Sequence, residues 1–371
     1  MLSGRYWPYH PKPRPDELLS SWLLRAAAGH GQAPYTFCNT VWPQRAILNR
    51  DIDHFCDPVL VETMAACTGT PLNRAFATTL PTYEGWLVDR YFPFGLTKWV
   101  LRTSLYHRVW RKAGLQYCPI CLASETPYFR RAWRLALNAV CSRHSVELLD
   151  RCPACSGTVM PHRAAEMHAC STCGFDLRAA PTRPADFPAL VLHRRHEAYL
   201  VRGWVQLAET HFAYSHLYFD LLRQVLKILA TGPRAQALRD VVARQWGGDP
   251  APLQFPEGAR EYERLGPADR HRMMALAARL LEGWPFRFVA ACAEARVWYS
   301  WAMRELAEPL GKSRAPYAYD EVARIFLLRR FYKPTAVEVR KAREYLTKTN
   351  PGHSQNDLIR IIGDSKMIYE R

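Results

Sequence analysis

The chain contains four short ligand pairs in one stretch: Cys118-Pro-Ile-Cys121, Cys141-Ser-Arg-His144, Cys152-Pro-Ala-Cys155 and Cys170-Ser-Thr-Cys173. Seven of its eleven cysteines belong to these pairs. Two residues between soft ligands allow a tight turn to direct both side chains at one tetrahedral ion, and four such ligands complete a structural zinc site. The stretch therefore predicts a central module that is folded around two zinc ions.

Neighbouring pairs are expected to share an ion, because they close a shorter loop than a cross-braced arrangement in which the first and third pairs combine. The predicted ligands are Cys118, Cys121, Cys141 and His144 for one site and Cys152, Cys155, Cys170 and Cys173 for the other. His162 and His168 lie in the loop of the second site, but four cysteines already suffice there. With four protein ligands, neither site keeps an open position for an activated water, so both zinc ions are expected to be structural.

The composition and net charge of the chain indicate which kinds of partner it binds. The 371 residues carry 50 Lys+Arg against 34 Asp+Glu, a formal charge of +16, which favours a polyanionic partner such as nucleic acid. The N-terminus lacks the apolar core of a signal peptide, and no run reaches the ~18 apolar residues of a membrane helix. The cysteines are therefore expected to be reduced, in a cytoplasmic protein.

The predicted fold is mainly α, in three domains. Residues 1–115 form a helical domain, 116–180 the tandem zinc-binding module, and 181–371 a helical C-terminal domain. Within the first domain, Asp16 is expected to cap a helix, and two apolar segments between Val59 and Thr78, separated by Thr68-Gly69-Thr70-Pro71, resemble a helix-turn-helix. In the third domain, apolar residues at helical spacing predict helices around Tyr218 to Leu229 and from Phe288 to Leu306.

Basic residues gather in three segments that are candidates for contact with nucleic acid or a protein partner, because cations neutralise phosphates while neighbouring aromatic rings can stack on bases. Arg130, Arg131 and Arg134 are expected to project outward. The full candidate set is Lys98, Arg102, Arg108, Arg111, Lys112, Arg130, Arg131, Arg134, Arg329, Arg330, Arg340, Lys341 and Arg343.

No catalytic motif is complete. Gly311-Lys312-Ser313 lacks the first glycine of a phosphate-binding loop, and His196-Glu197 lacks the second histidine of a zinc protease. A zinc deaminase needs a glutamate two residues after a ligand histidine, and Val146 stands at that position after His144. No catalytic residue is predicted, and the chain is not expected to be an enzyme.

Two separate motifs, in order and spacing, resemble the TniQ family of transposon target-selection proteins. The first is Pro13-Arg-Pro-Asp-Glu-Leu-Leu-Ser-Ser-Trp-Leu-Leu-Arg-Ala26. The second runs from Tyr117-Cys118-Pro-Ile-Cys121 through Trp133 and Val140-Cys141-Ser-Arg-His144 to Cys152-Pro-Ala-Cys155. The resemblance covers roughly residues 8–178, about half of the chain.

The resemblance implies a non-catalytic adaptor in DNA transposition. Such an adaptor links a target-DNA recognition module, for example a Cascade-like guide-RNA complex of a CRISPR-associated transposon, to an AAA+ transposition regulator of the TnsC/TniB type. The alternative is an autonomous sequence-specific DNA-binding protein, either a TnsD-like attachment-site reader or a zinc-containing transcription regulator. The sequence leaves open whether targeting is guided by RNA and whether the chain forms a homodimer.

Overall fold

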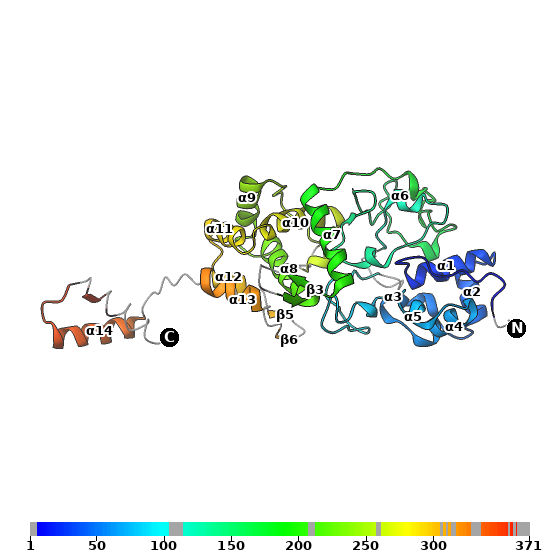
Figure 1. The fold of residues 1–371 in the computed structure, drawn as a ribbon. Coiled ribbons are helices and arrows are strands. Elements are labelled where there is room, and N and C mark those ends of the chain that lie inside the picture. Colours follow the sequence, from blue (N-terminus) through cyan, green and yellow to red (C-terminus); the bar gives the residue numbers. More distant parts are fainter. Residues whose placement is uncertain are drawn as a thin grey trace. The chain divides into compact units, whose positions relative to one another are not determined.

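In the computed structural model of the chain, the described residues are 6–103, 114–206, 212–256, 261–304, 307–308, 311–312, 317–327, 335–354, 357–358 and 361. Helices dominate these residues, which confirms the predicted mainly α fold (Figure 1). The chain divides into two compact units, Met1–Leu327 and Leu328–Arg371, a boundary that the sequence did not indicate.

The N-terminal helices of the first unit pack around their own apolar core, which includes Trp7, Trp22, Phe37, Leu60 and Met64. They are α1 (Leu19–Gly29), α2 (Pro34–Val41), α3 (Ile52–Phe55), α4 (Pro58–Thr68) and α5 (Leu72–Phe76), with 3-10 turns η1 (Ile47–Asn49) and η2 (Pro81–Tyr83). The Pro-rich arm before α1 is bound to this core, because the Trp22 indole donates to the Pro11 carbonyl at 2.7 Å.

The expectation that Asp16 caps α1 is wrong. The helix begins at Leu19 after Leu18, while Asp16 adopts φ +58° and directs its carboxylate at the Ala132 amide, 3.2 Å away. The aspartate therefore serves a contact with a distant segment rather than the start of its own helix.

The segment expected to resemble a helix-turn-helix does form two helices. Helix α4 ends at Gly69, which has φ +61° and closes the turn before the five-residue helix α5. A Cβ at Gly69 would lie 2.8 Å from the ring of Tyr6, so this position requires glycine both for its backbone and for space. Leu72, Asn73 and Arg74 of α5 are exposed.

The central module has little regular structure, as expected for a fold organised by metal-binding turns. It contains α6 (Pro119–Leu122), η3 (Arg131–Arg134), η4 (Pro161–Arg163), η5 (Leu177–Ala179) and an antiparallel pair, β1 (Val140–Cys141) with β2 (Val146–Glu147). A single apolar core continues from this module into the helices that follow it. The predicted boundaries at 115/116 and 180/181 stay predictions.

The helices after the module surround that shared core. They are α7 (Phe187–Arg202), α8 (Ser215–Ala230), α9 (Ala235–Trp246), α10 (Pro267–Leu281), α11 (Phe286–Glu294), α12 (Tyr299–Arg304) and α13 (Tyr317–Val322), with η6 (Tyr262–Arg264) and the π-turn η7 (Ala323–Leu327). Two hairpins join them: β3 (Trp204–Gln206) with β4 (Phe212–Tyr214), and β5 (Ala307–Glu308) with β6 (Gly311–Lys312). The predicted helix around Tyr218 is confirmed as α8, whereas the continuous helix from Phe288 is wrong, because Arg296 has φ +57° and separates α11 from α12.

The second unit contains α14 (Ala336–Thr349). Thr335 and Glu338 form a reciprocal capping box at its start. Its small apolar core consists of Ala342, Leu346 and Leu358.

Candidate metal centres and their surroundings

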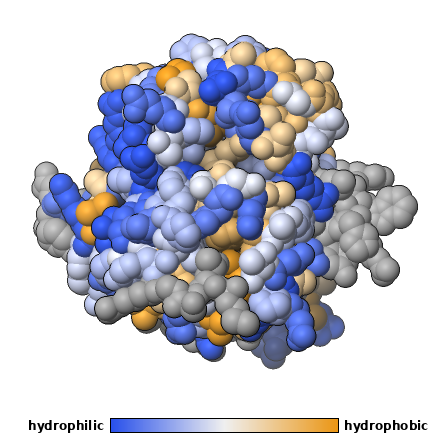
Figure 2. Space-filling view, turned by 90° about the vertical axis from the view of Figure 1, so that its right-hand side faces the viewer, coloured by the Kyte–Doolittle hydropathy of each residue, from blue (hydrophilic) through white to orange (hydrophobic). Residues whose placement is uncertain are grey.

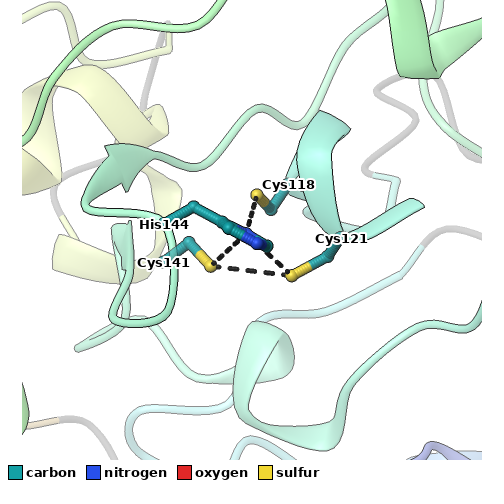
Figure 3. A group of neighbouring side chains, drawn as sticks. All are labelled: Cys118, Cys121, Cys141 and His144. Carbon is teal, nitrogen blue, oxygen red and sulfur yellow. Dashed lines mark hydrogen bonds between the residues drawn. The ribbon is translucent and has the colours of Figure 1, made fainter. Parts of the chain in front are cut away.

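The structure brings the first four predicted ligands together. The Sγ atoms of Cys118, Cys121 and Cys141 lie 3.4, 3.3 and 3.6 Å from Nδ1 of His144, and the sulfurs of Cys121 and Cys141 are 3.7 Å apart (Figure 3). All three cysteines are buried, and the first two are presented by α6. The four ligand atoms enclose one small volume with Nδ1 as the nitrogen donor.

The other four predicted ligands form a second cluster nearer the surface. Cys152 and Cys173 have their sulfurs 3.7 Å apart, as do Cys155 and Cys170. Cys155 and Cys173 are exposed, whereas Cys152 and Cys170 are buried. Ligands are thus shared between neighbouring pairs, and the cross-braced alternative is not the arrangement in the structure.

Local backbone geometry explains how each pair converges. After the second, third and fourth pairs, the next residue turns into the left-handed region: Ser145 at φ +55°, Ser156 at +56° and Gly174 at +74°. The amide of each donates to the carbonyl of the first ligand in its pair, at 2.8 to 2.9 Å. In the second cluster, the amides of Gly157 and Thr172 also point at cysteine sulfurs, at 3.4 Å.

These distances fit a tetrahedral ion. Zinc bonds of ~2.3 Å to sulfur and ~2.0 Å to nitrogen place two sulfurs roughly 3.8 Å apart and a sulfur and nitrogen roughly 3.5 Å apart. Every ligand atom in each cluster lies within 4.8 Å of the others. Both clusters can therefore hold a metal ion with four protein ligands.

The segment before α1 packs directly on the first metal-binding region. Leu18 N–H donates to the Phe129 carbonyl at 3.0 Å, and Phe129 N–H donates to Ser21 Oγ at 3.0 Å. Arg131 N–H donates to the Asp16 carbonyl at 2.7 Å. We call these contacts the motif junction, because they unite the two sequence motifs, more than 100 residues apart, in one structure.

The loop of the second cluster reaches back to the N-terminal helices. Its turn η4 lies against α1 and α2, where His162 is buried with its ring edge-on to Tyr35 at 6.3 Å. Nε2 of His162 has no hydrogen-bond partner among the described residues. Burial, with help from the neighbouring Arg163, lowers the pKa of His162 to about 4, so the ring is neutral and serves packing rather than metal binding.

Arg134 does not project outward, so that expectation is wrong. Its side chain is 2% exposed and bonds to Asp51 and Asp53, which come from the start of α3. A charged group inside a core needs opposite charges and hydrogen bonds around it, and Arg134 finds both there. This pairing could not be predicted from the sequence, because the partners are 83 and 81 residues away from Arg134.

The two aspartates share this one guanidinium unequally. Burial opposes the ionisation of Asp51, but Arg134 outweighs it and holds the pKa of Asp51 below its usual range. Burial raises the pKa of Asp53 to about 6 despite Arg134, and the adjacent charge of Asp51 adds to the rise. The network joins α3 to η3 and is a structural element.

The other predicted contact residues are dispersed. Arg130 stacks over the rings of Tyr128 and Trp133, Arg131 lies over the ring of Tyr83, and Lys98 pairs with Asp220. Exposed cations are found at Arg102 and, on α14 of the second unit, at Arg340, Lys341 and Arg343. Arg108, Arg111, Lys112, Arg329 and Arg330 lie outside the described residues.

The face formed by the N-terminal helices and the metal-binding module is chemically mixed. In Figure 2, hydrophobic residues occur in patches between hydrophilic ones. Across the ranges that the structure describes, no helix has both the length and the apolar character needed to cross a bilayer.

Comparison with known proteins gives one family. The TniQ family model matches residues 8–148, a range that contains both sides of the motif junction and the first metal cluster and ends before Cys152. No curated protein matches the chain.

Proposed function

Because the chain belongs to the TniQ family through residues 8–148, we propose that it is a non-catalytic adaptor in DNA transposition. In this role it links a target-DNA recognition module, a Cascade-like guide-RNA complex, to the AAA+ transposition regulator of the TnsC/TniB type. It acts in the bacterial cytoplasm, at the nucleoid, and a homodimer is one assembly in which it would present two copies of each partner surface.

The motif junction is the observation that carries this proposal. The family match begins in the Pro-rich arm and ends just after the first metal cluster, so it describes one folded body rather than two unrelated motifs. Hydrogen bonds from Leu18, Phe129 and Arg131 fix the two parts against each other. A rigid body of this kind can hold two partners at a fixed separation, which is what an adaptor requires.

Zinc is the metal we propose for both clusters, because sulfur-rich tetrahedral sites with a two-residue spacing select it. The ligands of Cys118 to His144 would fold the core of the adaptor, and those of Cys152 to Cys173 would fix the loop that contacts α1 and α2. With every coordination position taken by the protein, the ions would have no open position for an activated water, which favours a structural role for both. We retain the division into residues 1–115, 116–180 and 181–371 as the domain organisation of the adaptor.

The autonomous DNA reader remains the second candidate, and α4–α5 is the observation that favours it. Gly69 turns the chain so that Asn73 and Arg74 are exposed on α5, and asparagine and arginine are suited to reading base edges. Replacing Arg74 with alanine should weaken binding to a defined duplex if the chain reads DNA in this way. An adaptor without its recognition module should instead show weak binding that tolerates any sequence.

Co-purification tests the proposal. The tagged chain should retain the AAA+ regulator of its own transposon and, separately, the recognition module of that transposon. A matched pair of variants tests whether retention needs the folded motif: Glu17→Gln disrupts its buried part, whereas Glu62→Gln changes an exposed side chain on α4. Retention of neither partner by the folded wild-type chain would reject the adaptor role.

A further inference from the structure

An exposed row of aromatic rings lies on the hairpin between α7 and α8. Trp204 of β3 and Tyr214 of β4 are directly opposite in the strand pair, and their ring centroids are 4.2 Å apart. Tyr214 also stacks on His216 at 5.6 Å with an angle of 13° between the rings. Trp204 and Tyr214 remain 51% and 52% exposed, far more than packing within a core would leave.

Trp86 extends this row from a distant part of the chain. A Cβ added to Gly203 would lie 2.7 Å from the Trp86 ring, so the ring rests on the backbone just before Trp204. The Ser215 hydroxyl donates to the Trp86 carbonyl, and His216 Nδ1 lies 3.3 Å from the Gly85 carbonyl. Trp86 is 41% exposed. We call Trp86, Trp204, Tyr214 and His216 the aromatic row.

Two exposed cations lie on α7, the helix that leads into the aromatic row. Arg195 and Arg202 are exposed and seven residues apart on α7, which places them on one face of the helix, about 10 Å apart along its axis. Helix α7 leads through Gly203 straight into β3 (Figure 1). In the part of the chain that the structure describes, neither guanidinium forms an ion pair or a hydrogen bond, whereas the nearby acids Glu197 and Asp220 are bonded to His193 and Lys98.

We propose that the aromatic row, with Arg195 and Arg202, is a stacking platform for single-stranded nucleic acid. Trp204 and Tyr214 already stack on each other, so each of these two rings keeps at most one face for a base. Aromatic faces stack on bases of any sequence, and cations follow the phosphates. A duplex keeps its base faces covered, so a single strand is the form that fits. Tyr, Trp and Arg are also enriched at protein–protein interfaces, so these side chains do not choose the partner by themselves. The formal charge of +16 is what favours a polyanion here. The inference does not rest on the adaptor role, since it is measured on the purified chain alone.

Asp89 allows a test in which nucleic-acid binding is expected to become stronger. Asp89 is exposed on the loop that carries Trp86. Only Glu84 is an acid closer in sequence to Trp86, and its carboxylate already accepts a hydrogen bond from the Tyr91 amide. A carboxylate beside a phosphate-binding surface repels the strand. Asp89→Asn should therefore strengthen binding, which an apolar protein-docking surface would not predict.

The experiment measures the binding of the full zinc-loaded chain to labelled oligonucleotides by fluorescence anisotropy. The oligonucleotides have about 20 nucleotides, more than the ~4–16 nucleotides that one compact domain covers. Oligothymidylate and oligouridylate distinguish a DNA strand from an RNA strand, and a duplex of equal length is the competitor. The double variant Trp204→Leu/Tyr214→Leu keeps the apolar surface area but removes the aromatic faces. It should weaken oligonucleotide binding by at least roughly tenfold. Trp204→Phe/Tyr214→Phe keeps those faces and should stay within about threefold of the wild type.

The arginines provide a readout that does not depend on the hairpin fold. Arg195→Ala/Arg202→Ala should reduce the slope of log affinity against log salt by about 1.4, because two phosphate contacts are lost. Phe286→Ala removes a ring on α11 that is more exposed, at 72%, than any ring of the row, and should change nothing. The proposal is overturned if the leucine variant binds as the wild type does, if Phe286→Ala weakens binding equally, or if the wild-type chain prefers the duplex.

Discussion

Inside the protein, the two carboxylate oxygens of Glu17 accept hydrogen bonds from Nε and Nη2 of Arg25, each at 2.7 Å. The glutamate side chain is fully buried and that of arginine is 8% exposed. Arg25 also donates to the Lys12 carbonyl, and Glu17 accepts the Arg14 amide. Glu17 and Arg25 therefore fasten the Pro-rich arm to α1 and are not a surface for a partner.

Glu17→Gln should destabilise the chain by about 3–5 kcal/mol, because it leaves the Arg25 guanidinium buried without its counter-charge. Urea unfolding followed by circular dichroism measures the loss. Glu62→Gln, on the exposed side of α4, should stay within about 0.5 kcal/mol of the wild type. The combined Glu17→Gln/Arg25→Leu variant should recover part of the loss, and a cost below about 1 kcal/mol for Glu17→Gln alone would show that the pair is not structural.

Arg134→Ala should reduce stability rather than a specific binding activity. It leaves Asp51 and Asp53 buried together without a cation, at a cost of about 3–5 kcal/mol. Arg130→Ala, which removes only stacking over Tyr128 and Trp133, should cost about 1 kcal/mol. If Arg134→Ala unfolds at the wild-type urea concentration yet loses nucleic-acid binding, Arg134 is a contact residue after all.

Metal analysis by mass spectrometry should find two zinc ions per chain. Chelators should release the second ion first, because Cys155 and Cys173 are exposed whereas the cysteines of the first cluster are buried. Cys118→Ser and Cys152→Ser should each remove one ion and cause misfolding, since metal binding supplies folding free energy. Cys67→Ser, outside both clusters, should keep both ions, and a well-folded, metal-free Cys118→Ser/Cys152→Ser variant would refute structural zinc.

His162 should make the chain sensitive to acid. Its pKa is about 4 in the fold and ~6.5 in the unfolded chain, so below pH ~6.5 only the unfolded chain takes up the proton. The stabilisation is complete above that pH and is lost, by about 1.4 kcal/mol per pH unit, as pH falls toward 4. The difference in unfolding free energy between wild type and His162→Gln should therefore shrink from pH 7.5 to 5.5 in zinc-containing buffer.

A wild-type minus His162→Gln difference that does not vary with pH would mean that the imidazole can be protonated where it lies.

Local spacing is what made the metal clusters and the helices predictable. Each Cys-x-x-Cys or Cys-x-x-His pair closes its own turn, and the apolar period around Tyr218 already specifies the buried face of α8. Which ligand pairs share an ion could be predicted because neighbouring pairs close the shorter loop. These features depend on residues that are close in sequence.

Contacts between distant segments could not be predicted in the same way. The charge of Arg134 predicts an exposed side chain, whereas in the structure it is buried beside Asp51 and Asp53. The role of Asp16 likewise depends on a distant residue, because its carboxylate accepts a hydrogen bond from the Ala132 amide. The aromatic row was also missed, since Trp86 meets Gly203 only in the folded chain. A signal did exist in the alternation of Trp204, Val205 and Gln206, which is typical of a strand with one exposed face.

The central claim is that this chain bridges a recognition module and an AAA+ regulator. The most direct measurement immobilises target DNA with the recognition module bound and follows capture of the regulator, with and without the chain, by biolayer interferometry. Capture that requires both the recognition module and the chain, and that is lost with Glu17→Gln but kept with Glu62→Gln, is the predicted result. Capture of the regulator without the chain, or tight sequence-specific binding of the chain to bare DNA, would contradict the adaptor account.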